Sequence, residues 1–244
     1  LFGQTTSNFL SNHAPEMIDF GTNVGGGTAR IPQVRYSHKL APQTQLFVSA
    51  EEGNSSVATG TNLKYSLPNL TAKVTQGFAE GKGQASARAL IEHYKAGSAD
   101  DAIGFGVAAG ANYQVSDPLK VSADVSYVKG NSFYLYGSNS ADSAVNGNIE
   151  QNEAIGVQVG GTYKISPKLR TTLAYGAVFA DDGTEYASLN TSGNEKVQQA
   201  WANLIYTPVK PVDLGVEYVN GKRETFAGDS YKDNRVGLMA KYNF

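Results

Sequence analysis

The chain has 244 residues, a formal net charge of −2 and only 17% charged residues. This length suits one all-β domain, so we treat residues 1–244 as a single unit, and the near-neutral charge argues against nucleic-acid binding. The chain contains no cysteine, which excludes disulfides, thiolate metal sites and cysteine nucleophiles. Its 27 glycines, 14 tyrosines and 10 phenylalanines favour sheet and turns, and its apolar runs are far shorter than the roughly 18 residues of a membrane-spanning helix.

Apolar residues alternate with small or polar ones along most of the chain, which is the period of a strand with two unlike faces. The alternation is weaker in some segments and clear in others. The weaker segments are residues 1–7, 30–40, 44–52, 69–78, 83–95, 119–130 and 197–209. The clear segments are residues 102–116, 153–166, 169–180, 212–219 and 233–244. The sequence therefore predicts about twelve strands.

The connections between these strands alternate in length. Short turns carry Pro or Gly, whereas longer polar loops, such as residues 130–152 and 181–196, fall between them. Aromatic residues of the apolar face gather at both strand ends: Tyr113, Tyr163 and Tyr206 near the short turns, and Tyr127, Phe179 and Tyr218 near the opposite ends. Alternation alone would also fit a soluble β-sandwich. Two aromatic belts and unlike ends instead favour a transmembrane, up-and-down antiparallel β-barrel with its apolar face outward.

The first forty residues, "LFGQTTSNFLSNHAPEMIDFGTNVGGGTARIPQVRYSHKL", resemble the DcaP-like outer-membrane porins. In trimeric porins a strand leads into an inward-folded constriction loop, here about residues 8–29, and returns through "RIPQVRY". The ending "RVGLMAKYNF" resembles the C-terminal assembly signal of outer-membrane barrels, with Tyr242 and Phe244 as its aromatic residues. The resemblance implies sixteen strands, so we expect that the chain lacks about four strands at its N-terminal side.

The same resemblance implies a location and partners. It places the chain in the bacterial outer membrane, among lipid and lipopolysaccharide, as a homotrimer. The implied function is passive uptake of small anionic solutes such as dicarboxylates.

Strand parity places most strand bases on the inward face. The candidates for anion selection are Arg35 and Arg88, near mid-strand, followed by Arg170, Lys73, Lys164 and Arg235. Lys120 and Lys241 share this face, and the inward acids are fewer: Glu51, Glu92, Asp124, Asp213 and Glu217. A narrow channel lined by bases concentrates anions, and the planar fork of Arg matches a carboxylate. This pattern predicts an anion-preferring pore.

An alternative role for these bases is structural. They would pair with Glu16 and Asp19 of the constriction loop and hold it in place, which is compatible with selectivity because a transverse field needs both signs of charge. For Arg235, close to a rim, a solvated charge or a part in the assembly signal is favoured. We interpret Gly25, Gly26 and Gly27 as the flexible return of the loop and not as a phosphate cradle.

Other functions find less support in the sequence. His13, His38 and His93 lack metal-ligand spacing, and no Ser/His/Asp grouping is convincing, so we predict neither a metal, a cofactor nor an enzyme. A plugged structural or adhesion barrel, acting through its long extracellular loops, remains an alternative. Ion flux distinguishes the two hypotheses, because a plugged barrel does not conduct.

Overall fold

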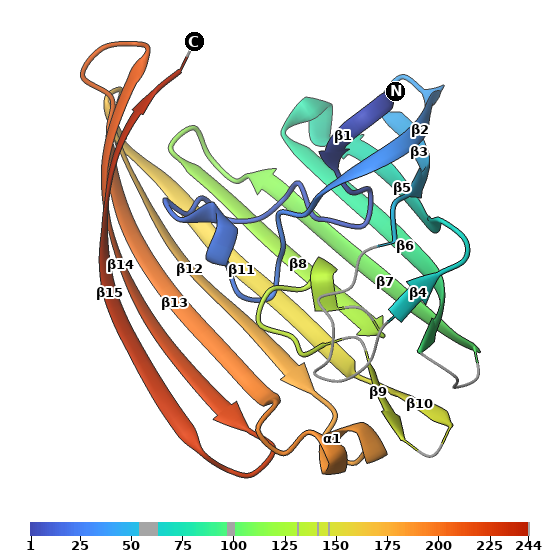
Figure 1. Ribbon diagram of the computed structural model, residues 1–244. Coiled ribbons are helices and arrows are strands. Elements are labelled where there is room, and N and C mark those ends of the chain that lie inside the picture. Colours follow the sequence, from blue (N-terminus) through green and yellow to red (C-terminus); the bar gives the residue numbers. More distant parts are fainter. Residues whose placement is uncertain (54–62, 97–100, 131, 141, 146, 244) are drawn as a thin grey trace.

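The structure, a computed structural model, describes residues 1–53, 63–96, 101–130, 132–140, 142–145 and 147–243. Phe244, one of the two predicted assembly-signal residues, lies outside these ranges. The fold is all-β and is dominated by one large antiparallel sheet, curved around a concave side (Figure 1). In the described part of the chain, no helix is long and apolar enough to cross a membrane.

Twelve strands follow one another across this sheet in chain order. They are β1 (Phe2–Thr6), β2 (Arg30–Ala41), β3 (Thr44–Glu51), β5 (Asn69–Phe78), β6 (Gly83–Ala96), β7 (Asp101–Gln114), β8 (Leu119–Lys129), β11 (Glu153–Ser166), β12 (Leu169–Ala180), β13 (Asn194–Tyr206), β14 (Val212–Thr225) and β15 (Ser230–Tyr242). β1 and β15 are the two ends of this series. The predicted all-β meander of about twelve strands is confirmed.

The remaining elements are short. β4 (Leu63–Tyr65) pairs with β6, while β9 (Asp142–Val145) and β10 (Asn148–Gln151) form a separate hairpin. Helix α1 (Glu185–Leu189) lies in a predicted polar loop, and the Thr184 side chain caps it by accepting a hydrogen bond from the Ala187 N–H. The described residues also include short 3₁₀ turns at Phe20–Thr22, Ala79–Gly81 and Ser132–Tyr134.

The two faces of the sheet differ as the alternation predicts. On the convex face large apolar side chains stand exposed, for example Leu173 at 70% and Leu238 at 82%. On the concave face the neighbouring positions are covered, as at Ala174 and Trp201. Because side chains of successive strand residues point to opposite faces, exposure alternates in the same way along the middle of other strands, for example β7 and β13. The convex face is the apolar outer surface of the sheet.

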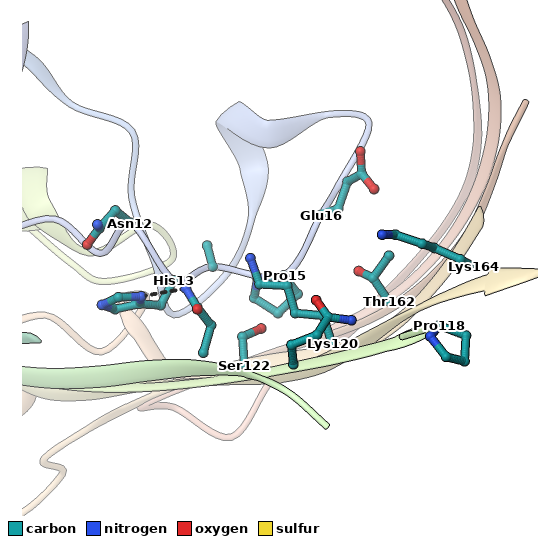
Figure 2. A pocket seen from close by; sticks show the side chains of 12 residues that line it. Asn12, His13, Pro15, Glu16, Pro118, Lys120, Ser122, Thr162 and Lys164 are labelled. Atoms are coloured by element: carbon teal, nitrogen blue, oxygen red, sulfur yellow. Dashed lines mark hydrogen bonds between the residues drawn. The ribbon is translucent and has the colours of Figure 1, made fainter. Parts of the chain in front are cut away.

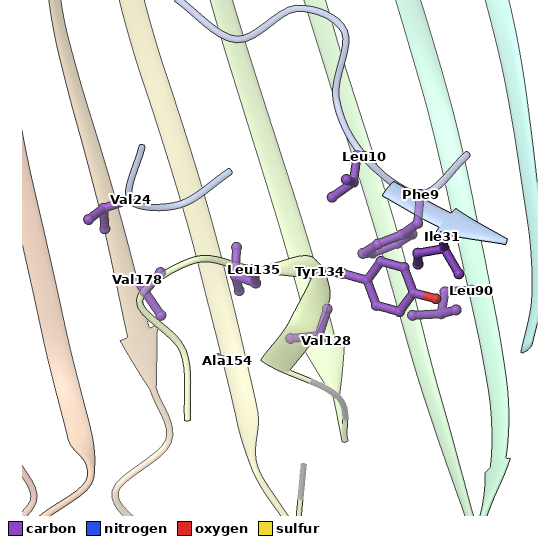
Figure 3. Close-up of a cluster of buried hydrophobic side chains, with 10 residues drawn as sticks. All are labelled: Phe9, Leu10, Val24, Ile31, Leu90, Val128, Tyr134, Leu135, Ala154 and Val178. Atoms are coloured by element: carbon purple, nitrogen blue, oxygen red, sulfur yellow. The ribbon is translucent and has the colours of Figure 1, made fainter. Parts of the chain in front are cut away.

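The concave face is less uniformly polar than the sequence predicts. Strand residues such as Leu90, Val128 and Val178 point inward and join a buried apolar cluster (Figure 3). Two connections fold onto this cluster: the one between β1 and β2, which contributes Phe9, and the one after β8, which contributes Tyr134. We expected residues 130–152 to be a polar loop. Its first part turns inward instead, because its aromatic and leucine side chains are stabilised by burial against an apolar floor.

Candidate functional site: the inward loop and the charges around it

Residues 7–29, which we call the inward loop, connect β1 to β2 and run across the concave side of the sheet (Figure 1). Near its beginning, the Asn8 N–H donates to Glu51 Oε1 at 3.1 Å and the Asn8 amide donates to Ser49 Oγ at 2.7 Å. Glu51 is fully buried and also accepts a hydrogen bond from the Thr71 hydroxyl at 2.5 Å. This carboxylate therefore fixes the start of the loop through a backbone N–H.

The middle of the inward loop is held by β13 and β14. The carbonyl oxygen of Glu16 accepts hydrogen bonds from the Trp201 indole at 3.0 Å and from the Asn203 amide at 3.1 Å. The Ile18 N–H donates to the Glu217 carboxylate at 2.9 Å. Met17 packs against Trp201 in a second buried cluster. Polar and apolar contacts thus fix the same segment.

Two of the predicted lumen bases pair with the two predicted loop acids. The Arg170 guanidinium donates to both carboxylate oxygens of Glu16, at 2.9 and 2.8 Å, and lies 3.5 Å from Asp213. Arg235 donates to Asp19 at 3.2 Å and to the Thr22 hydroxyl at 2.7 Å. The two-oxygen contact of Arg170 with Glu16 is both strong and directional. These two arginines hold the loop, and their charges are largely compensated.

Arg88 also has a carboxylate partner, on the sheet itself. Its guanidinium lies 2.6 Å from Asp124, and the two side chains are only 1% and 2% exposed. Asp124 in turn accepts a hydrogen bond from the Ser11 hydroxyl of the inward loop at 2.6 Å. The pair is therefore a buried, nearly neutral support beneath the loop, and its guanidinium is covered from solute.

Arg35 and Lys73 lie on the concave face with neutral partners. Arg35 donates to the Thr6 carbonyl oxygen and to Gln33 Oε1 at 3.0 Å, and the Lys73 ammonium lies 3.4 Å from the Leu10 carbonyl oxygen. Neither forms an ion pair in the part of the chain that the structure describes. The Glu51 carboxylate acts electrostatically on both cations without forming an ion pair with either.

Lys164 lines a cavity of about 390 Å³ beside the inward loop, together with Lys120 (Figure 2). His13 stands at the same cavity, with Nε2 at 3.0 Å from the Ser86 hydroxyl and Nδ1 at 2.9 Å from the Asn112 amide. Burial lowers the pKa of His13 to about 4, so the ring is neutral at pH 7. Three nearby cations add to this effect: Arg88, Lys73 and Lys120.

The three glycines at the end of the loop pack closely, in contrast to the flexible return that we expected. Gly25 has a φ of +80°, and a Cβ there would come within 2.3 Å of the Val157 carbonyl oxygen. A Cβ on Gly26 would collide with the Gln158 side chain, and one on Gly27 with the Tyr134 carbonyl oxygen. Because a Cβ on Gly25 or Gly27 would meet backbone oxygens, glycine at these two positions allows the loop to lie this close to β11 and to residues 133–136, which we call the second inward segment.

Several residues of the site were not singled out from the sequence. The second inward segment joins the loop through two backbone hydrogen bonds, Gly25 N–H to the Tyr136 oxygen at 3.1 Å and Tyr136 N–H to the Gly26 oxygen at 2.7 Å. Gln199 also accepts a hydrogen bond from the Val24 N–H at 3.1 Å. The aromatic run "FYLY" at residues 133–136, unusual in a polar loop, was the available signal for this segment.

The comparisons with known proteins identify a family and related folds. The family model described as DcaP outer membrane protein matches residues 1–244. The crystal structure of the outer membrane channel DcaP of Acinetobacter baumannii is 70% identical, with a TM-score of 0.97 over 100% of this chain and 71% of that one. OmpT of Vibrio cholerae, expressed in the outer membrane, shares only 12% identity but has a TM-score of 0.61 over 99% of this chain and 75% of that chain. None of the curated proteins matches.

Proposed function

The chain belongs to the DcaP outer membrane protein family and is a porin-type channel of the bacterial outer membrane, and on this premise we propose that it passes small anions such as dicarboxylates by passive diffusion. Residues 8–29, within one barrel domain, form its constriction. The selectivity is carried by those lumen bases that lack a carboxylate partner.

The observation that supports this proposal is the division of the concave-face bases into two groups. Arg88, Arg170 and Arg235 are paired with carboxylates. Arg35 and Lys73 have neutral partners, and the Lys120 and Lys164 side chains are exposed at the cavity beside the loop. Uncompensated charges of one sign in a narrow channel concentrate the opposite ion. The second group therefore favours anions.

Three acids of the concave face, Glu51, Glu217 and Asp213, have partners in the wall or in the inward loop. Glu51 and Glu217 are buried and accept hydrogen bonds from loop backbone N–H groups, so they lie behind the inward loop. Asp213 accepts hydrogen bonds from the Thr207 hydroxyl at 2.5 Å and from Arg170. Each of these carboxylates serves the wall or the loop, and the exposed lysines face the open space.

We further propose that the channel is a homotrimer in contact with outer-membrane lipid and lipopolysaccharide. The exposed apolar side chains of the convex face suit a hydrocarbon or subunit environment. A form of OmpT that shares the fold is described as a trimer. Chemical crosslinking of the native protein in its membrane tests the oligomer: a three-subunit product is expected, and a product no larger than one subunit would contradict it.

The reversal potential tests the selectivity. The native full-length protein is reconstituted in a planar bilayer under a KCl gradient, and we expect a potential of the sign that chloride preference produces. Replacing Lys73 with Gln should shift the potential toward zero. The matched control is Lys210→Gln, which removes a charge from an exposed turn between β13 and β14. This variant should leave the potential unchanged. A cation-selective channel would refute the proposal, and absence of conductance would favour a plugged barrel.

A further inference from the structure

The cavity beside the inward loop has a definite position along the channel. Its walls come from the loop at residues 12–16, from the ends of β7 and β8 and the turn between them, and from β11 (Figure 2). Pro118 belongs to one of the short turns, so the cavity opens on the short-turn side of the loop. Outer-membrane barrels keep their short turns at the periplasmic side. The cavity therefore lies where a solute leaves the constriction.

The cavity carries a net positive charge. Lys120 and Lys164 contribute two ammonium groups, and neither has an ion-pair partner in the described ranges of the chain. The one carboxylate at its edge, Glu16, is already engaged by both nitrogens of the Arg170 fork. His13 is neutral and adds no charge. A solute in this space meets two cations and no available anion.

The register of the strands brings the two lysines together. Lys120 of β8 lies opposite Thr162 of β11, and Lys164 is two residues further along β11 on the same face. Diagonal neighbours of this kind have Cα atoms about 7–8 Å apart, which is within reach of long side chains. The hydroxyls of Ser122 and Thr162 line the same wall. Two ammonium groups can thus engage the two ends of one short solute.

We propose that this cavity is a binding site for a short dicarboxylate, with one carboxylate at Lys120 and the other at Lys164. The site adjoins the Arg170–Glu16 pair, because Glu16 stands at its edge, and its two lysines take no part in that pair. It holds the solute on the periplasmic side of the constriction. This inference rests on the proposed anion channel and specifies where in that channel the substrate pauses.

The test compares succinate with acetate as blockers of the chloride current through the native full-length channel in a planar bilayer. Succinate should block at a lower concentration than acetate. It should also block at a lower concentration when it is added from the periplasmic side of the channel than from the opposite side. In Lys120→Gln/Lys164→Gln the half-blocking concentration of succinate should rise about tenfold, the equivalent of one charge-assisted contact. That of acetate should change much less. Lys210→Gln should change neither.

The outcomes separate this inference from the proposed function. If succinate blocks the double variant at the same concentration as the wild type, the site is overturned, and the chloride preference of the wild type leaves the anion channel standing. Equal changes for succinate and acetate would also overturn it, because they would indicate a general charge effect. A wild-type channel without chloride preference would refute the proposed function itself. The fluorescence of Trp201, which is buried against the inward loop, serves as the folding control of the double variant.

Discussion

Removing Arg88 should destabilise the protein, and removing its partner as well should restore much of the loss. Arg88→Met leaves Asp124 as a carboxylate that is only 2% exposed and has lost its cation. Arg88→Met/Asp124→Asn removes both charges and keeps an oxygen that can accept the Ser11 hydrogen bond. The comparison isolates the cost of an unpaired buried charge.

The expected magnitude follows from this burial. Breaking a buried ion pair by removing one partner costs about 3–5 kcal/mol, whereas replacing both partners by neutral groups is often close to neutral. The single variant should therefore lose about 3–5 kcal/mol of unfolding free energy, and the double variant much less than half of that. The difference arises because the single variant buries a carboxylate without its cation, whereas the double variant buries no charge.

Trp201, the only tryptophan of the chain, reports on the loop directly. Its indole is 1% exposed and donates to the Glu16 carbonyl oxygen of the inward loop. Urea titration of the reconstituted protein, followed by tryptophan fluorescence, measures the unfolding free energy. The reversal potential of the double variant should equal that of the wild type, because the pair has no net charge. A fully stable single variant would refute the burial argument, and a shifted potential in the double variant would show that Arg88 acts on solutes.

Three further predictions concern the inward loop. Gly25→Ala should destabilise its docking in the urea assay by more than the roughly 1 kcal/mol expected of Gly228→Ala, because both glycines have positive φ but only Gly25 also faces a close carbonyl oxygen. The pKa of His13 is lowered to about 4, so the unfolding free energy should fall as pH drops from 6.5 to 4, because in this range the unfolded chain binds a proton that the folded chain excludes. His13→Gln should flatten this dependence on pH, and an unchanged dependence would contradict the role of His13. Glu16→Gln should increase chloride preference by releasing the Arg170 charge, whereas Arg170→Gln should decrease it. Reversal potentials that shift in the same direction in both variants would contradict this pairing.

The strands and their faces could be predicted because they depend on a local period. Alternation at residues 169–180, for example, places Leu173 outward and Ala174 inward, as the structure has them. The same parity places Arg88 and Lys164 on one face and cannot tell them apart. Whether a base is paired depends on residues distant in the chain. Arg170 and Glu16 are 154 residues apart, and nothing local in either segment announces the contact.

The inward-facing glycines of the strands mark places where the inward loop packs against the sheet. A Cβ on Gly106 would meet the Phe9 ring at 2.6 Å, one on Gly160 would meet Pro15 at 2.8 Å, and one on Gly176 would meet the Val24 carbonyl oxygen at 2.1 Å.

These three glycines lie on three different strands, and each makes room for a successive part of the inward loop. Since a wall that faces only water has no steric need for glycine, a row of inward glycines across neighbouring strands indicates that another segment is packed there. Glycine positions, combined with strand parity, could therefore have predicted the path of the loop, although not the ion pairs that fix it.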